Sequence, residues 1–111
     1  FVYVKDAAAV LAHFYTTALS GKPTANGIYN IGTGEARSFK DLATNVMKSM
    51  GREPDITYID MPQDLQGKYQ YFTEATMQKL RDAGYTKAFH SLEEGVKDYV
   101  QNYLLQEDQY C

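Results

Sequence analysis

The chain has few of the residues that would place it in several common classes of protein. Its one cysteine, Cys111, cannot form a disulfide within the chain, so nothing indicates an oxidising compartment. No apolar run approaches the roughly 18 residues that span a bilayer. The 11 basic residues are fewer than the 14 acidic ones and do not cluster, which argues against nucleic-acid binding through phosphates. We therefore expect a cytoplasmic protein without a membrane or nucleic-acid partner.

Tryptophan is absent, whereas ten of the 111 residues are tyrosine. A buried tyrosine supplies ring area but needs a partner for its hydroxyl, and most of these tyrosines are expected to be packing residues. The length and the 44% hydrophobic content fit one small globular unit. A strand-like pattern begins at Phe1 without a leader or an initiator methionine, which predicts that residues 1–111 are part of a longer protein.

The pattern of apolar and polar residues predicts an α/β fold in which helices outweigh a few short strands. Strands are expected at 1–4, 28–31 and 56–59, and helices at about 6–19, 38–50, 73–84 and 91–104. Asp6, Ser38 and Thr73 are predicted helix caps, and Ser91 with Glu94 is predicted to form a capping box. Three short strands are near the limit of independent stability, so the helices are expected to pack partly on a sheet from sequence outside this chain.

Three features that could carry chemistry have simpler explanations. Gly32-Thr33-Gly34 begins like a dinucleotide-binding loop, but Arg37 stands where the third glycine belongs, so an ordinary turn is favoured over a cofactor site. Arg37 as a contact for an anion remains the lesser alternative. His13 and His90 have no ligand partner at metal-binding spacing and are predicted to be structural, with no metal site.

The polar loop 61–73 is the strongest candidate for a binding site. Lys68 can meet a phosphate, Tyr69 offers a ring and a hydroxyl, and Gln70 is a further polar neighbour. Gly67 allows the backbone to turn close to a ligand. From the residues alone, a surface turn with a packed tyrosine remains open beside the binding site.

The segments Phe1-Val2-Tyr3-Val4-Lys5-Asp6 and Gly27-Ile28-Tyr29-Asn30-Ile31-Gly32-Thr33-Gly34 resemble the C-terminal part of extended short-chain dehydrogenase/reductases that act on nucleotide sugars. Within that family, the segments at 65–73, 80–85 and 92–96 resemble the branch that epimerises ADP-linked heptoses. Lys68, where an arginine is common, and a longer turn at 50–55 depart from the family pattern. The likeness extends over nearly the whole chain.

The resemblance implies the C-terminal substrate-binding part, residues 1–111, of an extended Rossmann-type enzyme. That enzyme would oxidise and re-reduce the heptose at C6 with NADP, for lipopolysaccharide core synthesis, and would be a homo-oligomer. Tyr69, with Lys68 and Gln70 as weaker neighbours, would contact the ADP-sugar. The catalytic tyrosine-x-x-x-lysine pair and a complete cofactor loop are absent from the chain, so we expect no catalytic residue here and no activity from this chain alone.

Two alternatives stay open at this point. Another nucleotide-sugar epimerase or dehydratase of the same family would share the fold and differ in the nucleotide it prefers. A non-catalytic interaction module would instead use the amphipathic helix predicted at 92–104 to dock on a partner.

Overall fold

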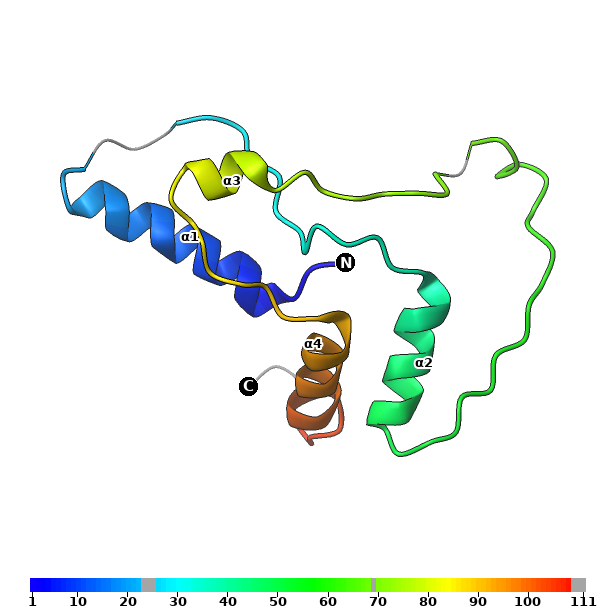
Figure 1. Cartoon of the computed structure of the whole chain (residues 1–111). Helices are drawn as coiled ribbons and strands as arrows, with labels where there is room; N and C mark the ends of the chain where they lie inside the picture. Colours follow the sequence, from blue (N-terminus) through cyan, green and yellow to red (C-terminus); the bar gives the residue numbers. More distant parts are fainter. Residues whose placement is uncertain (23–25, 69, 109–111) are drawn as a thin grey trace.

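The computed structural model describes residues 1–22, 26–68 and 70–108, and within these ranges the chain is helical and open. Figure 1 shows α1 (Val4–Leu19), α2 (Phe39–Ser49), the short α3 (Gln78–Asp82) and α4 (Leu92–Tyr99), which continues into a π-helical turn, Val100–Leu104. The Cα atoms extend over 53 × 40 × 20 Å. Residues 52–68 and 70–77 contain no helix and follow the outside of the molecule between α2 and α3 (Figure 1).

The three predicted strands are wrong, because the described residues contain no strand. The backbone at Tyr3 is extended, with φ −79° and ψ 138°, but it leads directly into α1. A strand needs a neighbour that pairs its amides and carbonyls, and no described segment lies in register with these three. The helical part of the expected α/β fold is confirmed.

Side-chain hydrogen bonds cap the start of two of the four described α-helices, α2 and α4. Ser38 accepts a hydrogen bond from the Asp41 amide, and the Asp41 carboxylate accepts one from the Ser38 amide. The predicted cap at Ser38 is therefore confirmed. The predicted box of Ser91 and Glu94 is also confirmed at the start of α4. Each box satisfies amides that a helix start leaves unpaired. Gly51, with φ +72°, follows α2 as a left-handed stop.

Two predicted caps are wrong. α1 begins at Val4, so Asp6 lies inside its first turn, and the Asp6 carboxylate bonds to His90 rather than to its own helix. α3 begins only at Gln78, after Met77. The hydroxyl of Thr73 lies 3.3 Å from Oε1 of Gln70 and caps no helix. The Asp6 carboxylate thus binds a residue distant in sequence, and the Thr73 hydroxyl binds a residue of its own loop, so neither accepts a hydrogen bond from a free amide at a helix start.

The core is small and lies between α1 and α3. Val10, Leu80 and Tyr85 are buried at its centre, and partly buried apolar side chains surround them: Ala9, Phe14, Tyr29, Ile31, Met77 and Phe89. Among the described residues, Val100 is the one other buried large apolar side chain. The described residues therefore form a small core for a chain of this length.

A second contact region joins α2 to α4 and the π-helical turn, and these segments lie side by side (Figure 1). The first residues of the chain connect this pair to α1. The hydroxyl of Tyr3 donates to the Asp98 carboxylate on α4, and Lys5 Nζ lies 2.7 Å from the same carboxylate. This connection places residues 1–4 along α4, where the principal cavity lies.

Candidate functional site

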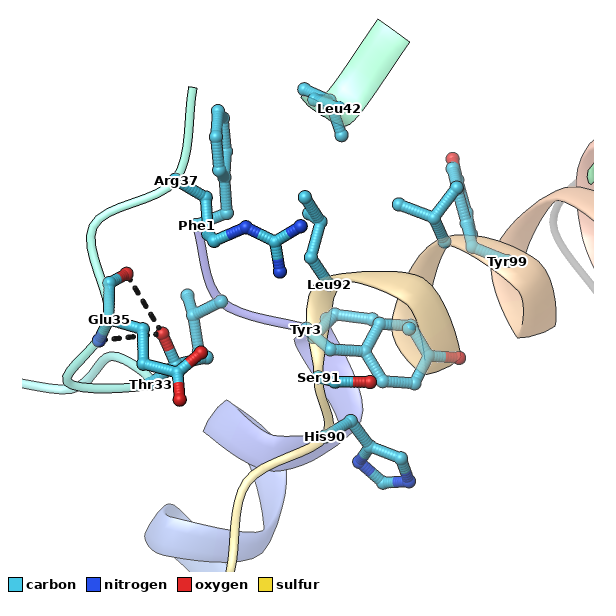
Figure 2. Close-up of a pocket in the computed structure, with 14 residues that line it drawn as sticks. Phe1, Tyr3, Thr33, Glu35, Arg37, Leu42, His90, Ser91, Leu92 and Tyr99 are labelled. Carbon is cyan, nitrogen blue, oxygen red and sulfur yellow. Dashed lines mark hydrogen bonds between the residues drawn. The ribbon is translucent and has the colours of Figure 1, made fainter. Parts of the chain in front are cut away.

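The principal cavity lies where the first residues of the chain meet the start of α4, the start of α2 and the loop before α2. Its volume is about 510 Å³. Figure 2 shows residues of these four segments facing the same space. The lining is mostly apolar, with polar groups at Thr33, Glu35, Arg37, His90 and Ser91. A mostly apolar cavity with a few polar groups is the usual form of a small-molecule site.

Arg37 is held at the cavity by carboxylates of its own chain. Its Nη1 lies 3.1 Å from Oε2 of Glu93 and its Nη2 lies 2.5 Å from Oε1, a bidentate arrangement. Nε lies 3.6 Å from Asp41. The Arg37 guanidinium lowers the pKa of Glu93 to about 2, chiefly by these hydrogen bonds. Arg37 thus links the loop before α2 to α4.

The loop beside Arg37 has a fixed local shape. The amide of Glu35 donates to the Thr33 hydroxyl at 3.2 Å, and that hydroxyl lies 3.3 Å from the Glu35 carbonyl (Figure 2). This is a side-chain turn of the kind that threonine forms with its neighbours. It leaves the Glu35 side chain exposed beside the cavity. The turn predicted at Gly32-Thr33-Gly34 is therefore confirmed as a turn.

The glycines of this turn are needed for packing against the chain itself. A Cβ on Gly32 would lie 2.9 Å from Cβ of Ala75, and one on Gly34 would lie 3.4 Å from Cγ of Met77. Gly34 also has φ +77°. A dinucleotide loop uses its glycines to bring the backbone close to a pyrophosphate. Here that space holds Ala75 and Met77, so these residues do not fit a dinucleotide.

A buried acid positions the wall of the cavity at His90. Asp6 is 2% exposed, and its carboxylate accepts from the His90 amide at 2.8 Å and lies 2.7 Å from Nδ1 of His90. The ring of Tyr3 lies edge-on to His90, with centroids 5.5 Å apart. The structural role predicted for His90 is in keeping with this position. His13 likewise lies edge-on to Tyr85 of the core, at 5.4 Å.

Gly95 has no side chain, which allows Tyr3 to pack directly against α4 in the wall of the same cavity. A Cβ there would lie 3.1 Å from Cβ and Cγ of Tyr3. Tyr3 could therefore not approach α4 so closely if residue 95 carried a side chain. The sequence pattern did not mark Tyr3, Gly95 or Thr33 as site residues. A glycine inside an amphipathic helix was the available signal, since such a glycine weakens the helix and often marks a close approach.

The loop predicted to bind a ligand lies in the exposed segment between α2 and α3. Residues 62–68 form successive turns, in which the amides of Leu65 and Lys68 donate to the carbonyls of Pro62 and Leu65 at 3.0 and 3.2 Å. Gly67 has φ +75°, as its predicted role in a turn requires. The side chains of Lys68 and Gln70 are exposed. Tyr69 lies outside the described residues.

The structure does not bring Lys68 or Gln70 to the principal cavity, because neither belongs to the described residues that line it. The predicted site and the cavity are thus two separate surfaces of this chain. Within the ranges that the structure describes, no group of three or more histidine, cysteine, aspartate or glutamate side chains could hold a metal ion. No described helix is long and apolar enough to cross a membrane.

Comparison with curated proteins gives consistent matches over almost the whole chain. A protein of Fusobacterium nucleatum subsp. nucleatum named ADP-L-glycero-D-manno-heptose-6-epimerase is 52% identical over 116 aligned positions, covering 99% of this chain. Proteins of the same name from two strains of Nitratidesulfovibrio vulgaris, DP4 and Hildenborough, are 52% and 53% identical and cover 99% and 97% of it. The chain is similar to part of ADP-L-glycero-D-manno-heptose-6-epimerase. The resemblance predicted from its sequence segments is confirmed.

The match covers only part of the length of the ADP-L-glycero-D-manno-heptose-6-epimerases. This chain spans 33% of the length of the first relative and 32% of each of the other two. No family model matches the chain. The alignments cover 97–99% of this chain, so they include the described helices and the loop between α2 and α3.

Proposed function

We propose that the chain is the C-terminal, substrate-binding portion of an ADP-L-glycero-D-manno-heptose 6-epimerase. The observation that carries this proposal is the identity of just over one half with three curated proteins of that name, across 97–99% of the chain. The whole enzyme would interconvert the two C6 epimers of the ADP-linked heptose, for synthesis of the lipopolysaccharide core. It would be a cytoplasmic homo-oligomer.

The nicotinamide cofactor, which we propose to be NADP, would be bound mainly by the part of the enzyme outside this chain. The Gly32–Gly34 turn does not fit a dinucleotide, since Ala75 and Met77 fill the space beside it. Glu35, next to the turn, would also repel a pyrophosphate. The contribution of this chain is therefore recognition of the sugar nucleotide rather than oxidation or reduction.

We assign recognition of the ADP-sugar to Tyr69, with Lys68 and Gln70 as neighbours. Support comes from the hydrogen-bonded turns of residues 62–68, which give the preceding backbone a defined shape. Lys68 is exposed, and an ammonium group can pair with a diphosphate without displacing a protein partner first. Gly67 has a φ of +75°, which glycine adopts without strain and which allows a sharp turn directly before these side chains.

The proposal is tested with the full-length protein and both C6 epimers of ADP-glycero-manno-heptose. We expect the protein to interconvert the epimers. Tyr69→Phe and Tyr69→Ala should each raise KM by about tenfold, because each variant loses one hydrogen bond to the substrate. Tyr58→Phe is the matched control, because Tyr58 is exposed and precedes the turns. Unchanged substrate affinity in both Tyr69 variants would show that this tyrosine does not bind substrate.

Competition by other nucleotide sugars separates the proposed enzyme from its nearest alternative. An ADP-linked sugar should inhibit best. Stronger inhibition by a UDP- or dTDP-linked sugar would instead assign the protein to a different epimerase or dehydratase. If the full-length protein responds to no nucleotide sugar, the remaining alternative is a non-catalytic module that docks through α4.

A further inference from the structure

The turns that precede Lys68 are exposed along their whole length. Residues 62–68 are all exposed, and Met61, directly before them, is partly buried. A loop without buried apolar contacts keeps one shape only where its own hydrogen bonds hold it, because ordering each residue costs conformational entropy. The position of Lys68 therefore depends largely on hydrogen bonds inside the loop.

Gln66 supplies a side-chain hydrogen bond that closes these turns. Its Nε2 donates to the carbonyl of Met61, five residues back, at 3.0 Å, which is a normal length for such a bond. A carbonyl only accepts hydrogen bonds, so the NH2 of the Gln66 side chain faces it. Proline at position 62 fixes the backbone angle φ next to that carbonyl. The bond thus joins the residue before the turns to the residue before Gly67.

Backbone hydrogen bonds carry this link on to Lys68. The amide of Leu65 donates to the Pro62 carbonyl at 3.0 Å, and the Lys68 amide donates to the Leu65 carbonyl at 3.2 Å. The Leu65 amide is therefore used inside the turns, while the Gln66 side chain serves the Met61 carbonyl at their start. Leu65 takes part in both backbone bonds and Gln66 follows it directly, so a shift of Gln66 would move Lys68.

We propose that Gln66 is a positioning residue for the substrate. Through the Met61 carbonyl it holds the turns in the shape that presents the Lys68 ammonium to the diphosphate of the sugar nucleotide. This inference rests on the proposed function, because it takes Lys68 as a contact of the ADP-sugar. A charged group on a loop that is already ordered binds without the entropy cost of ordering that loop. Gln66 itself contacts no substrate in this role.

Steady-state kinetics of the full-length protein, with an epimer of ADP-glycero-manno-heptose as substrate, test the proposal. Gln66→Met keeps the length of the side chain and removes the donor. Gln63→Met is the matched control, because Gln63 is exposed in the same turns and uses its backbone carbonyl in them. Gln66→Lys restores a donor of similar reach, and Gln63→Lys adds the same charge without replacing that donor.

We expect Gln66→Met to raise the KM for the ADP-sugar about fivefold and to leave kcat within about twofold, because binding is lost equally in the ground state and the transition state. Gln63→Met should change neither constant. Gln66→Lys should have the same KM as Gln63→Lys. A KM for Gln66→Met equal to that of its control would overturn the proposal. A lower kcat and a lower Tm at an unchanged KM would also overturn it, since they indicate general destabilisation.

A double-mutant cycle shows whether Gln66 acts through Lys68. In the Lys68→Ala background, Gln66→Met should change KM by less than about twofold, because the ammonium that Gln66 positions is gone. A fivefold effect that persists in this background would overturn the proposal. An unchanged KM in Lys68→Ala alone would do the same.

These measurements separate the inference from the proposed function. If the unaltered protein interconverts the epimers but Gln66→Met behaves like its control, the proposed function is retained and the positioning role is lost. If the unaltered protein acts on no nucleotide sugar, the proposed function itself fails, and the positioning role fails with it.

Discussion

The buried carboxylate of Asp6 pairs with the backbone amide and the ring Nδ1 of His90, a residue 84 positions away in the sequence. The His90 amide donates to Oδ2 at 2.8 Å, and Nδ1 of its ring lies 2.7 Å from Oδ1. An ionised carboxylate only accepts hydrogen bonds, so Nδ1 carries the hydrogen when Asp6 is ionised. These two hydrogen bonds hold His90, the residue before the Ser91 cap, against the first turn of α1, and they thereby position the start of α4.

Replacing Asp6 should therefore destabilise the protein more than replacing His90. Asp6→Ala removes both hydrogen bonds and leaves the partly buried His90 amide without its acceptor, at a cost of about 2–3 kcal/mol. His90→Ala removes only the ring contact, on a side chain that is 45% exposed, and should cost about 1 kcal/mol. Urea unfolding of the two variants measures the difference. Equal or reversed costs would show that the backbone bond contributes nothing.

The Arg37–Glu93 pair predicts a specific dependence of stability on pH. The pKa of Glu93 falls from 4.5 to about 2 in the folded protein. Because the folded pKa is the lower one, the stabilisation is present above the unfolded value and is lost as pH falls through the folded value. Glu93→Gln should therefore flatten the pH dependence of unfolding between about pH 4.5 and 2.

The effect should be modest, since the side chains of Arg37 and Glu93 are 26% and 49% exposed and are screened by solvent. Adding about 1 M salt should reduce it further. Glu53→Gln serves as the control, because Glu53 is exposed in the segment after α2. An identical change in both variants would indicate a general effect of net charge.

The contact between Gly32 and Ala75 predicts a compensating pair of substitutions. Gly32→Ala would place a Cβ 2.9 Å from that of Ala75, closer than two methyl groups can lie, and neither side chain can rotate away. We expect a loss of about 1–3 kcal/mol in the free energy of unfolding. The second substitution, Ala75→Gly, should recover part of that loss, as a double-mutant cycle would show. Additive costs would mean that the two residues are not in contact.

The helices were predictable where short-range chemistry decides them. The apolar spacing of α2 and α4 predicted those two helices. The cap at Ser38 and the box of Ser91 with Glu94 were predictable because their donors and acceptors lie within one helical turn of each other. Such pairs form whatever the rest of the chain does. The predicted helix at 73–84 was too long, because the Thr73 hydroxyl contacts Gln70 and α3 begins only at Gln78.

The candidate site was predictable only in part. A polar turn at Gly67 followed by Lys68 could be recognised from residue types. The cavity could not, because its lining comes from four segments, such as Tyr3, Arg37, Leu42 and Val96, that are distant in sequence. The partners of Arg37 and Asp6 were equally hidden, since Glu93 and His90 are 56 and 84 residues away.

The sequence by itself determined the helices α1, α2 and α4, the cap at Ser38, the box of Ser91 with Glu94, the turn at Gly67 and the likeness to the heptose epimerases, because each depends on neighbouring residues or on their order along the chain. Tertiary structure alone decided that the segments at 1–4, 28–31 and 56–59 do not pair as strands, that the Asp6 carboxylate binds His90, and that Leu11 and Tyr15 of α1 are exposed. Strand pairing and burial depend on which distant segment lies opposite, and residue types do not specify that segment.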